Sequence, residues 1–255
     1  MTKQRQGSLA HLKAALVAVL VFYAVTMLVG CGGSGGTGGG GGATSAATGA
    51  DFQRPASLAM PAASAAGASI DTDHVNEGYV VAHASDASRL KFQVAKGDEV
   101  YNYDLPNNDS ATVFPVNMGN GGYLFRIMKN TEGNNYIELD SVNAEVSLSS
   151  EFVPLLIPNQ FCEYNESSAC VSKANELTAS VSNQGEAVQV ICEFVINHVS
   201  YDTDKARELS SKTGYIPNPD QTLSSGKGVC FDYASLGAAM LRSQGIPTKV
   251  ITGYV

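Results

Sequence analysis

Basic residues, histidines and metal-binding spacings are scarce in this sequence of 255 residues. Lysine and arginine number 16 against 24 aspartates and glutamates, which gives a formal net charge of −8. Binding to nucleic acid calls for basic patches, so nothing in this charge balance indicates a nucleic-acid partner. The five cysteines form no CxxC pair and the four histidines form no cluster. We therefore expect neither a zinc site nor a bound cofactor.

Long hydrophobic runs are absent apart from one near the N-terminus. Residues 14–30 are free of charge and mostly apolar, and they follow Lys3, Arg5 and Lys13. At about 17 residues the run is at the lower limit for a membrane-spanning helix. Its end, "LVGC", resembles the bacterial lipoprotein signal, which implies that residues 1–30 are a signal peptide and that Cys31 carries a lipid. An uncleaved apolar anchor is the alternative.

Either reading predicts a chain outside the cytoplasm, in the cell envelope, anchored to a bacterial membrane. Removal of residues 1–30 takes away three positive charges and no negative ones, so the exported part has 13 basic and 24 acidic residues, a net charge of −11. Such acidity favours solubility and repulsion from anionic surfaces.

Glycine, alanine and serine dominate the stretch after Cys31. Residues 31–77 begin with "GGSGGTGGGGGATSAATGA" and remain poor in large apolar side chains. A segment of this composition buries little surface, so we expect a flexible tether.

An antiparallel β-domain is expected over residues 78–150. Apolar residues alternate with polar ones in three runs, between turn-forming sequences such as "LPNND" and "NTEGNN". A period of two with polar turns is typical of antiparallel strands with one solvated face. The alternating residues are Leu90, Phe92 and Val94, then Tyr101, Tyr103 and Leu105, then Val142, Ala144, Val146 and Leu148.

Helical spacing replaces this alternation in residues 151–255. One helix is expected around residues 171–181, a second from about Asn183, and a third over 231–244, where Gly245 and Pro247 end it. A long loop over 202–229 and a final strand over 248–255 complete the prediction. The fold class is therefore α+β.

Three further cysteines lie in this second half. Cys162 and Cys170 flank a polar loop, and in an exported protein they are candidates for a disulfide, with free thiols as the equal alternative. Cys192 lies on the apolar face of its helix, where a buried and inert thiol is expected.

Cys230 differs because "GKGVC" leads directly into a helix. The unpaired N–H groups and the positive end of a helix favour a thiolate, and the same N–H groups can hold an oxyanion. The position is compatible with a catalytic nucleophile, although most cysteines at helix starts are structural.

The sequence around Cys230 also resembles the core of the transglutaminase-like superfamily. The matching features are the glycine two residues before Cys230, the sequence Asp232-Tyr233-Ala234, the "LR" at Leu241 and Arg242, and "GIP" leading to "GY". The resemblance implies a papain-like fold with a Cys-His-Asp triad, in which Cys230 attacks a glutamine carboxamide or a peptide carbonyl to form a thioester. It extends more weakly to secreted bacterial transglutaminase-like lipoproteins with an N-terminal β-domain.

The family supplies its catalytic histidine and acid from strands after the "GY" segment, so we expect this chain to be a fragment that is inactive as it stands. Among its histidines, His198 is a weak candidate for the base, because the last turn of a helix explains it equally well. His83 is expected on a strand. Asp232 is expected to stabilise the first helical turn, and Tyr233 to belong to the core.

Two functions follow from these expectations. The first is an exported thiol acyltransferase or peptidase that acts on protein or peptide substrates, including cell-wall peptides. The second is a non-catalytic surface module in which the β-domain binds envelope polymers or proteins. A histidine encoded downstream of residue 255 would favour the first, and a stop codon there would exclude it for this polypeptide.

Overall fold

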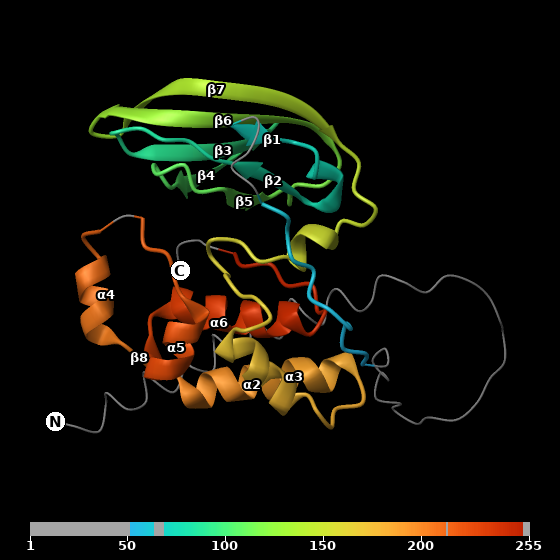
Figure 1. Ribbon diagram of the computed structural model, residues 1–255. Coiled ribbons are helices and arrows are strands. Elements are labelled where there is room, and N and C mark those ends of the chain that lie inside the picture. Colours follow the sequence, from blue (N-terminus) through green and yellow to red (C-terminus); the bar gives the residue numbers. More distant parts are fainter. Residues whose placement is uncertain (1–51, 64–68, 213, 252–255) are drawn as a thin grey trace, which may run out of the picture.

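The structure is a computed structural model that describes residues 52–63, 69–212 and 214–251. Its fold is α+β, as the sequence predicts, with two antiparallel sheets above a layer of helices (Figure 1). None of the helices in these three ranges combines the length and the apolar character needed to cross a membrane. Residues 1–30 and Cys31, the predicted signal peptide and lipidation site, lie outside the described ranges.

The larger strands form a four-stranded sheet with the order β4-β3-β6-β7, and the smaller ones a three-stranded sheet with the order β1-β2-β5. All neighbouring strands in both sheets are antiparallel. The strands are β1 (Ile70–Asp71), β2 (Tyr79–Ala82), β3 (Leu90–Lys96), β4 (Glu99–Leu105), β5 (Thr112–Pro115), β6 (Gly121–Glu132) and β7 (Asn135–Val146).

The two sheets bury one apolar core between them. Phe92 from β3 stacks on Phe114 from β5 with ring centroids 4.4 Å apart, and neither ring is exposed to solvent. Leu90 and Val94 are buried on the same face of β3, which confirms the alternation expected there. Tyr101, in contrast, is exposed, because this half of β4 extends beyond the core.

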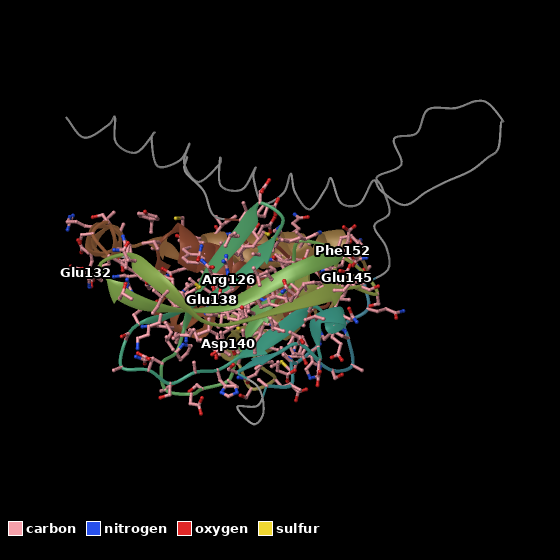
Figure 2. The ribbon with its side chains drawn as sticks, turned by 90° about the horizontal axis from the view of Figure 1, so that it is seen from above. Arg126, Glu132, Glu138, Asp140, Glu145 and Phe152 are labelled. Carbon is pink, nitrogen blue, oxygen red and sulfur yellow. The ribbon has the colours of Figure 1, made fainter. Side chains whose placement is uncertain are left out.

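Acidic side chains cover part of the outer face of the larger sheet. Glu138 and Glu145 of β7 are exposed there (Figure 2). Charges directed into solvent on this face match the expected solvated side of the sheet.

The helices form the second layer, in which α2, α3 and α6 share one apolar core. The layer contains α2 (Ala169–Leu177), α3 (Gln184–His198), α4 (Thr203–Leu209), α5 (Pro219–Ser225) and α6 (Cys230–Ser243). The short strand β8 (Ser200–Tyr201), between α3 and α4, pairs in parallel with β9 (Lys227–Gly228), between α5 and α6. The start of α3 is as predicted, because the Asn183 side chain accepts a hydrogen bond from the N–H of Glu186.

The structure differs from the predicted loop over 202–229, which contains α4 and α5. Asp202 caps α4 by accepting from the N–H groups of Asp204 and Lys205. Asn218 caps α5, and Pro219 follows at the first helical position. Both caps are visible in the sequence, but each helix has only seven residues, too few for the apolar period to show.

The final strand is also different from the expectation. Residues 248–251 belong to no strand, and the Thr248 N–H donates to the carbonyl of Leu155 at 3.0 Å. Leu155 is the last residue of the short 3-10 helix η2 (Val153–Leu155), so the bond is to this helix and not to a strand edge. Residues 252–255 of the expected strand lie outside the described ranges.

The predicted tether contains ordered structure at its C-terminal end. Ile70 of β1 and Val75 of the 3-10 helix η1 (Val75–Glu77) are buried in the sandwich core. Earlier, Arg54 donates to Gln244 and Thr178 at 2.8 Å each, which attaches residues 52–63 to the helical layer. Phe52 and Leu58, two of the few large apolar residues of this stretch, pack against the core of the helical layer.

Candidate active site around Cys230

Cys230 is the first residue of α6, and its side chain is exposed. The helix is found within one residue of the predicted range. Behind the cysteine, Leu236, Ala239 and Met240 are completely buried against α2 and α3. The fold thus holds a solvent-accessible thiol at the end of a rigid, buried helix.

Asp232 fixes the start of this helix. Its Oδ2 accepts a hydrogen bond from the Val229 N–H at 2.8 Å, while the Asp232 N–H donates to the Val229 carbonyl. Gly228 makes room for the carboxylate, because a Cβ at that position would lie 2.6 Å from the Asp232 Cβ. The glycine two residues before the cysteine is therefore a steric requirement of the aspartate two residues after it.

Two further residues complete the buried environment of Asp232. Lys205 of α4 places Nζ 2.8 Å from Oδ2, and the Tyr215 hydroxyl donates to Oδ1 at 2.5 Å, while the carboxylate is wholly buried. Partial burial by itself would lower the pKa of Lys205, but hydrogen bonds to Asp232 and Tyr215 outweigh it, and the pKa is raised. Burial, followed by the bond to Asp232, raises the pKa of Tyr215. Asp232 thus has the structural role expected of it.

Aromatic rings link the site to the sandwich. Phe231, next to the cysteine, lies 5.5 Å from Phe161 and 6.4 Å from Tyr215 between ring centroids. Phe161 in turn lies 5.6 Å from Tyr103 of β4. The start of α6 is therefore supported from the β-domain side by a continuous row of rings.

Backbone donors are available beside the thiol. Within the described ranges, neither the N–H of Cys230 nor that of Phe231 has a hydrogen-bond partner. Unpaired N–H groups in the first turn of a helix attract anions and can stabilise a developing oxyanion. The site thus combines a nucleophile with the electrostatic feature that acyl transfer requires.

The other motif residues shape the far end of α6. Arg242 is buried and donates to the carbonyls of Ile157 at 2.6 Å and Thr248 at 2.9 Å. Gly245 follows the helix with φ of 77°, a conformation that favours glycine. Tyr233 is in the core as expected, and its hydroxyl donates to the Val199 carbonyl.

The described histidines make their contacts elsewhere. His198 Nε2 lies 2.6 Å from the Leu223 carbonyl, and its ring stacks on Phe194. His83 Nδ1 lies 2.8 Å from Asp109, and His74 stacks on Tyr79. None of these contacts brings a described histidine to Cys230. In the same ranges, no cluster of histidine, cysteine, aspartate and glutamate has the arrangement of a metal site.

Cys162 and Cys170 are free thiols in the structure, which is the second of the two alternatives that the sequence leaves open. Both are completely buried, and the two lie in the same core cluster. Cys162 is held in a turn closed by backbone bonds to Asn159, and the N–H of Cys170 donates to Asp220, so backbone contacts fix each one separately. Cys192 is half-buried, and burial raises its pKa, as expected of an inert thiol.

Alkaline pH is expected to destabilise the fold through Cys162. Burial raises the pKa of this thiol from 9.0 to about 11, so its stabilising contribution is present below pH 9 and is lost as the pH rises through about 11. The loss should approach about 3 kcal/mol. Urea titrations in the presence of a phosphine reductant should show that the unfolding free energy decreases less between pH 9 and pH 11 for Cys162→Ala than for the unmodified protein. Equal decreases in both proteins would contradict this assignment.

Sequence reasoning found Cys230 and Asp232 but missed Lys205 and Tyr215. Lys205 follows a recognisable helix cap at Asp202, so its helix could have been predicted. Its pairing with a carboxylate 27 positions later has no local signal.

Comparison with protein families supports the class of protein that this site indicates. Residues 171–255 match the model of the transglutaminase-like superfamily, so this part of the chain, which includes Cys230, is transglutaminase-like. The match concerns a family of cysteine-based catalysts and covers the helical layer, not the sandwich.

Two individual proteins are similar over parts of the chain. The UPF0252 protein MJ1282 of Methanocaldococcus jannaschii is 28% identical over 105 residues, which are 39% of this chain and 29% of that protein. The chain therefore spans less than a third of that relative's length. The crystal structure of a candidate cysteine protease from Cytophaga hutchinsonii superposes with a TM-score of 0.32 and 14% identity, covering 67% of this chain and 63% of that one.

Proposed function

We propose that this chain supplies the nucleophile of an exported, lipid-anchored enzyme that transfers or hydrolyses acyl groups of protein or peptide amides. The observation that supports this most strongly is the exposed Cys230 at the start of α6, beside two unpaired backbone N–H groups. The thiolate would attack the amide carbonyl carbon, and the oxyanion would lie against the N–H groups. A thioester would form as the C–N bond breaks and the nitrogen, protonated by water, leaves as the amine. An amine or water would then take the acyl group.

The exported and anchored state remains part of the proposal. It depends on the signal-like residues 1–30 and on Cys31, which the structure does not describe. Cell-wall peptides are one class of substrate for an enzyme in that location. A non-catalytic module that binds envelope proteins is the second candidate, since no described histidine lies beside Cys230.

Acetylation by p-nitrophenyl acetate tests the nucleophile in the 255-residue chain. Cys230 sulfur should attack the acetyl carbon and form a thioester, while p-nitrophenolate leaves with the bonding electrons and needs no protonation by a histidine. Mass spectrometry of peptides should locate the acetyl group on Cys230, and Cys230→Ser should remove the fast phase of nitrophenolate release. Cys192→Ser, which alters a half-buried thiol, should leave that phase intact. Equal release by the Cys230→Ser protein would refute the proposal and favour the binding module.

A further inference from the structure

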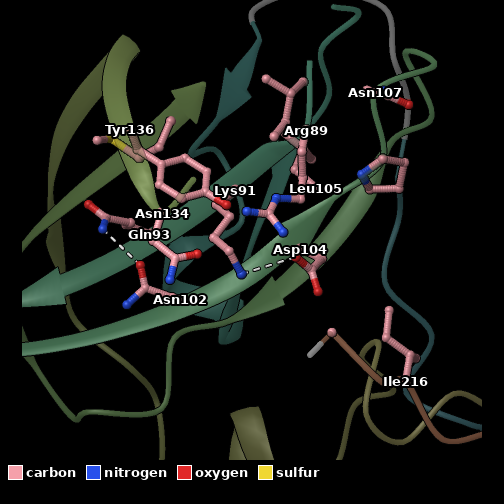
Figure 3. A pocket seen from close by; sticks show the side chains of 14 residues that line it. Arg89, Lys91, Gln93, Asn102, Asp104, Leu105, Asn107, Asn134, Tyr136 and Ile216 are labelled. Atoms are coloured by element: carbon pink, nitrogen blue, oxygen red, sulfur yellow. Dashed lines mark hydrogen bonds and ion pairs between the residues drawn. The ribbon is translucent and has the colours of Figure 1, made fainter. Parts of the chain in front are cut away.

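A groove of about 920 Å³, lined by both polar and apolar side chains, lies on the outer face of the four-stranded sheet. Lys91 and Gln93 of β3 stand opposite Asp104 and Asn102 of β4, and hydrogen bonds of 3.1 Å and 2.8 Å join the two pairs (Figure 3). Tyr136 of β7 contributes to the opposite side of the groove. Neither the motif around Cys230 nor the proposed chemistry uses this surface.

Two polar atoms in the groove lack partners. Gln93 Oε1 and the Tyr136 hydroxyl oxygen are covered by protein and have no hydrogen bond, although Gln93 uses its nitrogen to bind Asn102. A buried polar atom without a partner costs about 1–3 kcal/mol. A ligand that moves the covering side chains and binds these atoms would recover that energy, so the groove favours a ligand with both donors and acceptors.

The charge of the groove is opposite to that of the chain. Lys91 is paired with Asp104, whereas Arg89 has no ion pair within the described ranges. The Arg89 guanidinium makes one 3.3 Å bond to the Gly133 carbonyl and lies 5.6 Å from the centroid of the Tyr136 ring. Arg89 is therefore a cation without an ionic partner among the described residues, placed over the Tyr136 ring, in a protein with a net charge of −8. A ligand carboxylate would pair with Arg89 and draw it off Tyr136.

The groove ends beside the candidate active site. Gly214 and Ile216 line it, and Gly214 packs so close to Asp104 that a Cβ would lie 3.1 Å from Oδ2. Tyr215, between them, is hydrogen-bonded to Asp232 in the first turn of the helix that Cys230 begins. Three consecutive residues therefore connect the two places: Gly214 and Ile216 line the groove, and Tyr215 between them contacts α6.

From this arrangement we infer that the groove is a binding subsite for an extended, acidic peptide segment of the substrate. Peptide N–H and carbonyl groups match the unpartnered oxygen atoms of Gln93 and Tyr136, and a carboxylate side chain matches Arg89. That the bound peptide is a substrate rests on the proposed function of Cys230. The binding itself does not, because none of these groups takes part in the chemistry.

Fluorescence anisotropy tests this inference with the 255-residue chain. The probes are a fluorescein-labelled, glycine-flanked glutamine peptide with glutamate on both sides of the glutamine, and its twin with lysine in place of glutamate. At physiological ionic strength, where repulsion over long distances is screened, the acidic peptide should bind more tightly. Arg89→Gln should weaken its binding about tenfold and Tyr136→Phe about threefold, as expected for a charged and a neutral hydrogen bond.

Matched variants separate the groove from other causes. Arg207→Gln removes the same charge from an exposed site on α4 and should leave the affinity unchanged. Cys230→Ser should also bind normally, so a failure of the proposed chemistry would not hide binding in the groove. Equal affinity for the two peptides, unchanged binding by both groove variants, or binding of a chitin tetrasaccharide but of neither peptide would overturn the inference.

Discussion

Replacing Cys230 by serine is expected to lower amide turnover by the protein about a thousandfold or more. The reason is that a serine hydroxyl at this helix start is a far weaker nucleophile than a thiolate, while the shape of the site is retained. Incorporation of a dansylated amine into dimethylcasein measures acyl transfer, and release of ammonia without incorporation measures hydrolysis.

A thiol-to-hydroxyl change away from the site gives the control for this result. Cys192→Ser makes the same atomic change in a half-buried residue of α3 and should retain most of the activity. If the Cys230→Ser protein stays active, the thiol is not the nucleophile. If the unmodified protein shows neither reaction, the function as a binding module gains support.

Replacing Lys205 by methionine is expected to reduce the free energy of unfolding by about 3–5 kcal/mol. The Asp232 carboxylate is fully buried, and without Lys205 no cation among the described residues would pair with its charge. Methionine keeps much of the length of the side chain, so the loss reports mainly on charge. Since the chain has no tryptophan, urea denaturation followed by circular dichroism is the suitable measurement.

Lys173→Met provides a closely matched comparison. The Lys173 side chain is 29% exposed against 28% for Lys205, but its partner Glu176 is 69% exposed, whereas Asp232 is 0% exposed. Ion pairs with an exposed partner contribute less than about 1 kcal/mol. Similar losses for the two variants would show that burial of Asp232 does not determine the energy of this pair.

Local signals account for the parts of the fold that could be predicted. The cap at Asn183, the alternation along β3 and the apolar spacing of α6 each act within a few residues, and the corresponding elements form where expected. The position of Cys230 at a helix start belongs to this group, because a glycine-rich turn and an apolar helix face define it locally.

Contacts between distant residues account for what could not be predicted. The bond between Lys205 and Asp232, the docking of Arg54 on Gln244 and the bond from Thr248 to Leu155 join segments whose meeting depends on the finished fold. The free state of Cys162 is of the same kind, since core packing determines the environment of its side chain.

The attachment of residues 52–63 to the helical layer has a mechanical consequence. Tension on the chain upstream of Phe52 would act first on the bond from the Phe52 N–H to the Ser182 carbonyl and then on the hydrogen bonds of Arg54 to Gln244 and Thr178, not on the sandwich. Gln244 directly follows α6, so the load would reach the opposite end of the helix that Cys230 begins. The β-sandwich, and the groove on its outer face, would carry little of that force.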